Sequence, residues 1–198
     1  MGETSRDRQR EATRQRLYEA ALGIFRRDGF RDARVDDITL VAGVSRTAFY
    51  FHFPTKEDVL TELIRRTEAP IAVAVSELHP DAELPTVLET VTDWLTRTWQ
   101  DERALIVDTM AIGLRVESAT SPEANPNGLR AQLAARFERA VQNGVLHDAQ
   151  RPAALADLYL LNCMSAMASW AQGEGRGLIE ALQLANQLFL NGARRRLG

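Results

Sequence analysis

Side chains that suit an anionic, partly stackable partner recur on one face of a short predicted helix. At about 100° per residue, one face, here called the polar–aromatic face, carries Arg46, Thr47, Tyr50 and Phe51. Ala48, Phe49 and Phe53 turn the other way, toward an expected core. An arginine, a hydroxyl and two aromatic rings match the base edges and flanking phosphates of a DNA major groove. The pattern therefore predicts a surface that contacts DNA.

Two short helices joined by a tight turn are predicted to hold this face. Apolar residues recur at helical spacing in the first helix, at Val35, Ile38, Val41 and Ala42. Gly43 lies where the chain must reverse, in a backbone conformation that glycine adopts without strain. The Ser45 hydroxyl can then cap the second helix. The pattern is that of a helix-turn-helix.

A lysine follows at the expected start of the next helix. Thr55 is predicted to cap that helix, with Asp58 completing an approximate capping box. Lys56 would then occupy the first helical position, where the macrodipole disfavours a cation by about 0.3–1 kcal/mol. A phosphate docked at this helix end would reverse the effect. The alternative is a solvated lysine without a partner.

The run AGVSRTAFYFHFPTKEDVL, preceded by a basic arm and an amphipathic helix, resembles the DNA-binding domain of the TetR family of bacterial transcriptional repressors. The resemblance covers about residues 10–64. It implies that the polar–aromatic face enters the groove and that Ser45, His52 and Lys56 lie at phosphates. Arg34 stands where the family usually has Thr or Ser, so the hydroxyl cap expected there is missing. An arginine could instead reach a phosphate itself.

Charge is distributed unevenly along the 198 residues, whose formal net charge is −3. Residues 1–56 hold 11 Arg or Lys against 8 Asp or Glu, and residues 57–198 hold 13 against 19. A basic head on an acidic body is typical of a DNA-binding domain attached to a part with another task. We therefore predict a helix-turn-helix DNA-binding domain over residues 1–55 and a helical ligand-binding and dimerisation domain over residues 56–198.

The chain is predicted to be all-α, with about nine helices, because long alternating apolar–polar runs are missing. The basic arm carries Arg6, Arg8 and Arg10, and is expected to be disordered in the free protein. It could lie along a phosphate backbone or in a minor groove, or simply be a solvated tail. Pro70 is expected to kink or break the helix that starts near residue 56.

Catalytic and metal-binding patterns are not found in the sequence. The histidines at 52, 79 and 147 lack ligand-like spacing, and there is neither a cysteine pair nor a glycine-rich phosphate loop. We therefore expect no enzyme, no metal and no cofactor. The single Cys163 excludes an internal disulfide, and the apolar stretch at 153–171 is interrupted by Asp157 and Asn162. A cytoplasmic protein without a membrane segment is expected.

The predicted second domain contains many rings and flexible side chains. Such a set is typical of a packed core, but the resemblance favours a mainly apolar ligand cavity. The candidate cavity residues are Trp94, Trp99, Met110, Phe137, Tyr159, Asn162, Met164, Met167 and Trp170. Asn162 is the polar insert on an apolar helix, and a buried amide needs a partner. That partner is either a ligand or a neighbouring group of the core.

Two long apolar helices, at about 152–171 and 178–195, end the chain. Their apolar residues either complete the monomer's own core or pair with a second copy, as in proteins that this one resembles. The candidate dimer residues are Leu155, Leu158, Leu178, Leu182, Ala185, Leu188 and Phe189. A two-fold operator demands a two-fold protein, so we expect a homodimer.

The resemblance thus implies a repressor that binds a two-fold operator in double-stranded DNA and is released by a small apolar effector. The alternative is a DNA-binding regulator whose second domain is controlled by a protein partner or has no ligand.

Overall fold

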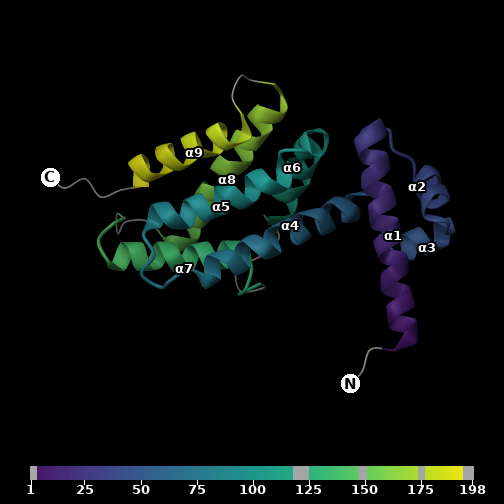
Figure 1. Cartoon of the computed structure of the whole chain (residues 1–198), viewed down its shortest axis with the longest axis horizontal. Coiled ribbons are helices and arrows are strands. Elements are labelled where there is room, and N and C mark those ends of the chain that lie inside the picture. The colour runs from purple at the N-terminus through teal and green to yellow at the C-terminus, as the bar shows by residue number, and fades with distance from the viewer. Residues whose placement is uncertain (1–3, 118–124, 147–150, 174–176, 194–198) are drawn as a thin grey trace. The chain divides into compact units, whose positions relative to one another are not determined.

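The computed structural model of the chain describes residues 4–117, 125–146, 151–173 and 177–193. Within these residues it contains nine helices, which confirms the all-α prediction (Figure 1). They are α1 (Ser5–Asp28), α2 (Val35–Ala42), α3 (Arg46–His52), α4 (Glu57–Glu77), α5 (Leu84–Trp99), α6 (Arg103–Glu117), α7 (Leu129–Gln142), α8 (Pro152–Ala171) and α9 (Leu178–Ala193). His147 lies outside the described residues, as do the last residues of the expected final helix, 194 and 195.

Two compact units divide between Leu63 and Ile64, eight residues later than the predicted boundary after residue 55. The first turns of α4 therefore belong to the N-terminal unit. Val59 and Leu60 are fully buried there. The rest of α4 and helices α5 to α9 form the C-terminal unit.

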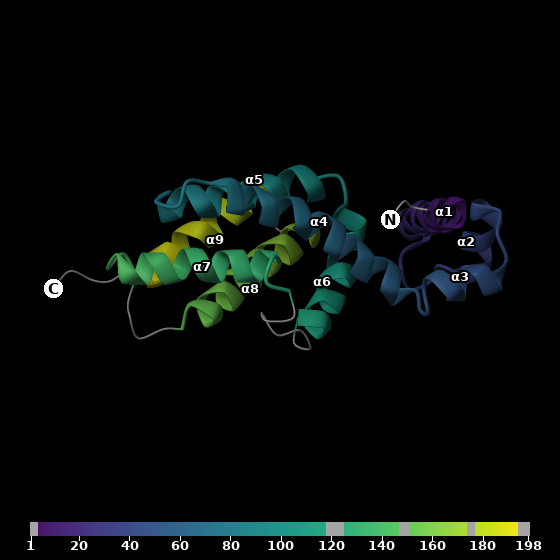
Figure 2. The ribbon, with the colours of Figure 1, turned by 90° about the horizontal axis from the view of Figure 1, so that it is seen from below.

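The N-terminal unit packs α2 and α3 beside α1, which is seen end-on in Figure 2. Helix α1 is amphipathic, as expected, and its buried face carries Leu17, Ala20, Ala21, Ile24 and Phe25. Ile38 of α2 and Phe49 of α3 complete this core, and both are inaccessible to solvent. The turn pair is thus fixed to the longest helix of the unit by its apolar side chains.

The N-terminal segment is helical from Ser5, where a disordered arm was expected. Thr4 caps α1: its hydroxyl accepts from the Asp7 amide at 3.2 Å, and the Asp7 carboxylate accepts from the Thr4 amide at 3.1 Å. This capping box satisfies free amides of the first turn, so the helix can begin ahead of its apolar stripe. Arg6, Arg8 and Arg10 are therefore carried on α1.

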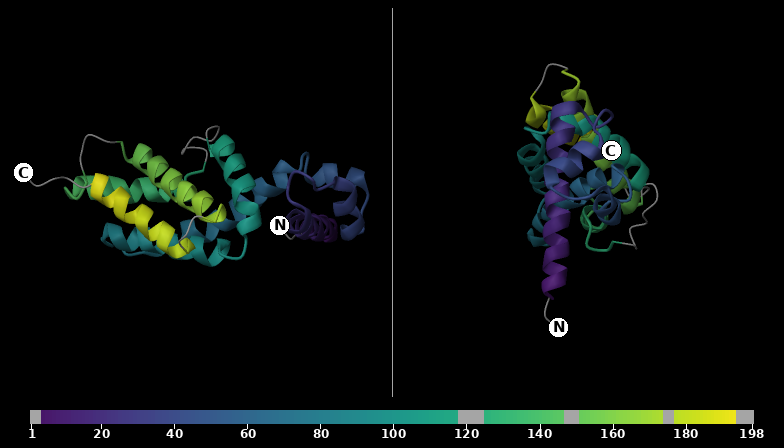
Figure 3. Two further views of the ribbon diagram at one scale, coloured as in Figure 1. Left: turned by 90° about the horizontal axis from the view of Figure 1, so that it is seen from above. Right: turned by 90° about the vertical axis from the view of Figure 1, so that its right-hand side faces the viewer.

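The C-terminal unit is built on α8, which contacts α6, α7 and α9, while α5 covers α9 from another side. Figure 3 shows α8 and α9 running side by side. A ring cluster lies at the centre: the Tyr159 ring centroid is 6.2 Å from that of Phe137 and 5.2 Å from that of Phe189. Edge-to-face pairs of this kind favour one packing arrangement over others.

A series of buried, hydrogen-bonded polar groups runs through the same core. The Tyr159 hydroxyl lies 3.0 Å from Asn186 Oδ1 and 3.2 Å from the Leu88 carbonyl oxygen. Asn186 Nδ2 in turn lies 3.5 Å from the Thr92 hydroxyl. These contacts join α8, α9 and α5 and supply the partners that buried polar groups need. Burial raises the pKa of Tyr159 well above its ordinary value, so the hydroxyl stays protonated and can donate.

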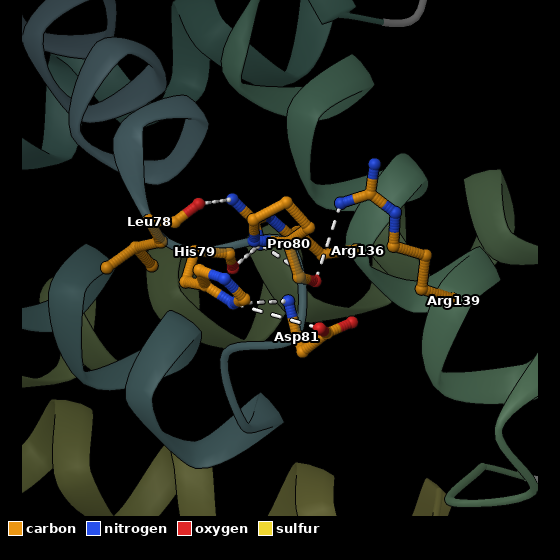
Figure 4. A network of polar contacts seen from close by, with 6 residues as sticks. All are labelled: Leu78, His79, Pro80, Asp81, Arg136 and Arg139. Atoms are coloured by element: carbon orange, nitrogen blue, oxygen red, sulfur yellow. Dashed lines mark hydrogen bonds and ion pairs between the residues drawn. The ribbon is translucent and has the colours of Figure 1, made fainter.

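Helix α4 continues through Pro70, so the proline does not break it. Its C-terminal end is closed by the buried Arg136 of α7 (Figure 4). Arg136 Nη1 donates to the His79 carbonyl at 2.7 Å, and Nη2 donates to the carbonyls of Val75 and Leu78, both at 2.7 Å. The last carbonyls of a helix have no partner within the helix. A guanidinium supplies several donors in a fixed fork and can satisfy them together.

Candidate nucleic-acid interface and ligand cavity

The predicted helix-turn-helix is present, with its turn at Gly43. This residue is left-handed, with φ 64° and ψ 40°, and its neighbour Val44 donates to the Thr39 carbonyl at 3.1 Å. Ser45 caps α3, because its hydroxyl accepts from the Ala48 amide at 3.2 Å. The turn and cap fix the direction in which α3 leaves α2.

The polar–aromatic face is exposed, as predicted. Tyr50 is 45% and Phe51 66% accessible to solvent, and Arg46 and Thr47 are exposed beside them. Phe49 and Phe53 are fully buried on the opposite side. Adjacent exposed apolar side chains with a polar rim are typical of an interaction site.

Arg46 pairs with Asp36 of α2 across the turn. Its Nη1 lies 2.9 Å from Asp36 Oδ1, and both side chains are largely exposed. Because an exposed ion pair contributes little to stability, the guanidinium can exchange the carboxylate for another anion at small cost. Arg46 is therefore oriented along the polar–aromatic face and remains available there.

Helix α2 differs from the prediction in its apolar stripe. Val41 was expected to turn inward, but it is 62% exposed, and Leu40 beside it is more exposed still. Thr39 takes the buried position, with its hydroxyl donating to the Asp36 carbonyl at 3.0 Å. An eight-residue helix offers only a narrow inward face, and Ile38 and Ala42, one turn apart, already fill it.

Lys56 has a structural role that neither alternative foresaw. Its ammonium donates to the backbone carbonyls of Phe30, Arg31 and Ala33 at 2.8, 3.1 and 3.0 Å. All three ammonium hydrogens are thus engaged. The predicted capping contacts are present beside it, because Asp58 accepts from the Thr55 amide at 2.7 Å and its own amide reaches the Thr55 hydroxyl at 3.3 Å. A phosphate contact by Lys56 would have to compete with three existing hydrogen bonds.

Arg34 and His52 flank the polar–aromatic face at the two ends of the turn pair. Arg34 is exposed at the start of α2 and makes no side-chain cap, as its residue type predicted. His52 is half-buried. Burial lowers the pKa of His52, and the nearby cations Arg10 and Arg14 lower it further. An adjacent phosphate would raise this pKa, since it favours the protonated ring.

Helix α1 contributes two arginines to this region: Arg10, which was expected in a disordered arm, and Arg14, which was not singled out from the sequence. The Arg10 guanidinium lies 5.1 Å from the Phe51 ring centroid, over a hollow lined also by Asp7, Glu11 and His52. Arg14 Nη1 donates to the His52 carbonyl at 2.6 Å and so closes the C-terminal end of α3. The spacing of four residues between Arg10 and Arg14 would have placed both on one helical face, had the arm been taken as helix.

A mainly apolar cavity lies inside the C-terminal unit. The space within it that the centre of a water-sized sphere can occupy has a volume of about 60 Å³. Of the candidate cavity residues, those that line it are Trp99, Met110, Met164 and Met167. Residues that the sequence reasoning did not single out complete the wall: Ile64, Thr67, Glu68, Leu95, Thr109, Gly113, Leu129, Leu160 and Cys163. Three of them, Ile64, Thr67 and Glu68, come from α4.

The remaining candidate cavity residues lie elsewhere. Phe137 and Tyr159 belong to the central ring cluster, and Trp94 is half-buried outside the cavity wall. Asn162, expected to be buried, is exposed, and its Nδ2 donates to the Leu158 carbonyl at 2.9 Å. Helix α8 is apolar on most sides, so its sequence did not reveal which side faces inward.

Cys163 lies in the cavity wall as a buried thiol. Burial raises its pKa to about 12. The thiol is therefore protonated at neutral pH, where it is a poor nucleophile.

Most of the candidate dimer residues complete the monomer's own core. Those that are buried within it are Leu155, Leu178, Leu182, Ala185 and Phe189. Leu158 of α8 and Leu188 of α9 are 51% and 64% exposed, and Leu161 and Leu184 are exposed on the same two helices. These four leucines form the outer leucine face.

Across the described residues, no group of three or more His, Cys, Asp or Glu side chains could hold a metal ion. In the same part of the chain, no helix combines the length and apolar character needed to span a membrane.

Residues 17–63 match the family model described as bacterial regulatory proteins, tetR family. The transcriptional regulator SrpR of Pseudomonas putida is 43% identical over 61 residues, which are 31% of this chain and 29% of SrpR. The regulator TtgW of the same species is 42% identical over 59 residues, 30% of this chain and 44% of TtgW. The chain therefore matches less than half the length of these relatives.

The fold of the whole chain is shared more widely. FadR of Thermus thermophilus, a TetR-family repressor solved with lauroyl-CoA, aligns over 93% of this chain and 97% of its own, with a TM-score of 0.69 and 24% identity. SmeT, the repressor of a Stenotrophomonas maltophilia efflux pump, aligns in complex with triclosan over 94% and 93% of the two chains, with a TM-score of 0.61 and 20% identity. Residues 17–63 thus match the N-terminal domain of the TetR family of bacterial regulatory proteins, and the whole chain shares the fold of solved TetR-family regulators.

Proposed function

We propose that this transcriptional regulator binds a two-fold DNA operator as a homodimer, acts as a repressor, and is released by a small apolar molecule in its C-terminal unit. The observation that carries the DNA-binding part is the exposed polar–aromatic face on α3, directly after the left-handed glycine turn. The four side chains of this face have no core to serve, and together they match the groove of a duplex.

On the operator, α3 lies in the major groove with Tyr50 and Thr47 toward base edges. Arg46 exchanges Asp36 for an acceptor on DNA, because its present pair is exposed. Ser45, Arg34 and His52 border the groove and contact phosphates. Arg10, carried on α1 beside Phe51, adds a further cation at this edge.

The dimer is proposed to form through the outer leucine face. Four exposed leucines on two neighbouring helices are an unusual surface for a monomer, since burying them removes a large apolar area from water. A second copy related by a two-fold axis brings the same face to itself. The two α3 helices of the dimer would then lie in successive major grooves about 34–36 Å apart.

Release is proposed to act through α4. The cavity wall includes Ile64, Thr67 and Glu68, so a molecule in the cavity contacts the helix whose first turns belong to the DNA-binding unit. Arg136 holds the other end of α4, which leaves the cavity end as the part that can shift. A ligand alters the equilibrium only by its difference in affinity between the two conformers. Ligand complexes of FadR and SmeT support a cavity of this kind.

A second candidate is a regulator whose C-terminal unit receives a protein partner or no ligand. The small volume of the cavity favours it, because about 60 Å³ admits little without movement of the wall. Thermal stabilisation by small apolar compounds would separate the two candidates, since only a ligand-binding protein gains stability from them.

Selection of bound DNA from a random pool tests the proposed function. We expect a palindromic site, and we expect Tyr50→Ala to lower its affinity by about ten- to a hundredfold, as the loss of a base contact should. Val145→Ala, an exposed change in the other unit, is the matched control. The proposal fails if no palindrome emerges, or if Tyr50→Ala binds the selected site as tightly as Val145→Ala does.

A further inference from the structure

The cavity of the C-terminal unit contains a hydroxyl without a partner. Thr109 on α6 is completely buried, its Oγ1 makes no hydrogen bond, and it lines the cavity wall. Native proteins satisfy nearly all buried polar groups, so an unpaired one that borders an open space calls for an explanation.

Other helical threonines of this chain satisfy themselves. Thr61, Thr90 and Thr96 each donate to the backbone carbonyl four residues earlier, at 3.1, 2.8 and 2.8 Å. Thr109 makes no such bond, although it lies within a helix and has the same option. Its hydroxyl is therefore left for a group that enters the cavity.

The surroundings of Thr109 define the rest of that group's chemistry. Three methionines and Trp99 border the same space, which makes the cavity suited to apolar atoms of adaptable shape. The ionisable groups in the wall are Glu68 and Cys163, and burial raises the pKa of the Cys163 thiol so that it stays neutral. None of the residues that line this space is Lys, Arg or His, so a carboxylate or phosphate ligand would lose its hydration without gaining a cationic partner in the wall.

From these contacts we infer that the effector is a neutral, mainly apolar molecule with one hydroxyl or carbonyl oxygen, which hydrogen-bonds to Thr109. This inference rests on the proposed ligand control and names the chemical class of the ligand. The geometry gives the oxygen one anchoring position on α6, while the apolar body lies against the methionines and α4.

Substitutions at Gly113 provide an independent test of the same cavity. A Cβ added there would lie 3.5 Å from Met164 Cε and 3.6 Å from Ile64 Cδ1, ordinary contact distances. A methyl group is thus tolerated, and a longer side chain at this position would occupy the cavity. Gly113→Leu should exclude any ligand while Gly113→Ala keeps the fold.

The test uses the full chain and three probes of one shape: 4-ethylphenol, 4-ethyltoluene, in which a methyl replaces the hydroxyl, and the anion 4-ethylbenzoate. Binding is measured by titration calorimetry in the absence of DNA. We expect the phenol to bind about three- to tenfold more tightly than the toluene, the size of one neutral hydrogen bond. The benzoate should bind most weakly.

Thr109→Val removes the hydroxyl at constant shape and should abolish the preference for the phenol, whereas Thr109→Ser should keep it. Thr96→Val, which removes a hydroxyl outside the cavity, should leave the preference unchanged. Gly113→Leu should prevent binding of all three probes. The inference is overturned if the phenol preference survives in Thr109→Val, if the benzoate binds most tightly, or if none of the probes binds.

Operator release is measured separately with the selected DNA. Probe binding that depends on Thr109 but does not release DNA would contradict ligand control and leave the chemistry of the cavity intact. Release by an anion, independent of Thr109, would contradict the inferred ligand class and leave ligand control intact.

Discussion

At the scale of single residues, Lys56 makes contacts that its local sequence pattern does not predict. The sequence placed a lysine beside a capping box, and both features are present. The cation is used within the protein because residues 30–33 bring three carbonyls to the same point. Those carbonyls lie some 25 residues away in sequence, and no local rule predicts that they converge.

We expect Lys56→Met to destabilise the N-terminal unit by about 1.5–3 kcal/mol, because charge-assisted hydrogen bonds to three carbonyls are lost. The neighbouring Arg31→Met removes a cation from an exposed position and serves as the control. Hydrogen exchange of the amides in α1 to α3 measures the loss, since the three tryptophans all lie in the other unit. A purely phosphate-binding lysine would instead leave exchange unchanged and lower the salt dependence of DNA binding by about one unit.

Other residue-scale predictions succeeded where a local pattern settled the answer. The polar–aromatic face followed from helical phase, because Phe49 and Phe53 identify the buried side of α3 and leave the other side exposed. The prediction that Asn162 is buried was wrong for the opposite reason. Because α8 carries apolar residues on most sides, its sequence does not indicate whether Asn162 faces the core or the solvent. Thr109 was missed because a threonine within a helix ordinarily bonds its own backbone.

At the scale of elements, the sequence predicted the helix ends that neighbouring residue types determine, and it did not predict those that depend on residues far away in the chain. The turn at Gly43 and the cap at Ser45 are signalled by residue type and were predicted. The early start of α1 at Ser5 depends on Thr4 and Asp7, a capping pair that stands well before the apolar stripe. The closure of α4 by Arg136 comes from another helix, 61 residues beyond Val75, and is a tertiary contact.

Arg136→Met is expected to destabilise the C-terminal unit by about 2–4 kcal/mol. Its removal leaves the carbonyls of Val75, Leu78 and His79 without their donor in a buried site. Urea unfolding followed by tryptophan fluorescence reports on this unit alone, because Trp94, Trp99 and Trp170 all lie in it.

Arg139 provides the control for this prediction. It belongs to the same helix and reaches only the Pro80 carbonyl, at 3.5 Å, from an exposed position (Figure 4). Arg139→Met should therefore change the free energy of unfolding by less than about 0.5 kcal/mol. Equal effects of the two changes would mean that the buried guanidinium does not close α4.

At the scale of the whole molecule, the uneven charge of the chain only partly follows its division into two units. Residues 1–56 carry an excess of Arg and Lys, but Glu57, Asp58 and Glu62 in the first turns of α4 belong to the same unit and offset it, while the other unit has an acidic excess. Like charge keeps the second unit from binding phosphates indiscriminately. The sequence also predicted two apolar helices at the end of the chain. It could not divide their leucines between core and surface, since both faces of each helix are apolar.

The outer leucine face leads to the last prediction. Leu188→Arg should convert the protein from a dimer to a monomer at micromolar concentration, because a charged side chain buried at a two-fold interface meets its own copy. Light scattering coupled to size exclusion measures the mass, and tryptophan fluorescence checks that the unit remains folded. Val145→Arg places the same charge on a comparably apolar, exposed position outside α8 and α9, and should remain dimeric.

The monomeric variant should also lose affinity for the full palindrome while it retains weak binding to a half-site, since a single helix-turn-helix reads only half of the operator. A wild-type protein that is already monomeric, or a Leu188→Arg variant that remains a dimer, would exclude this face as the interface.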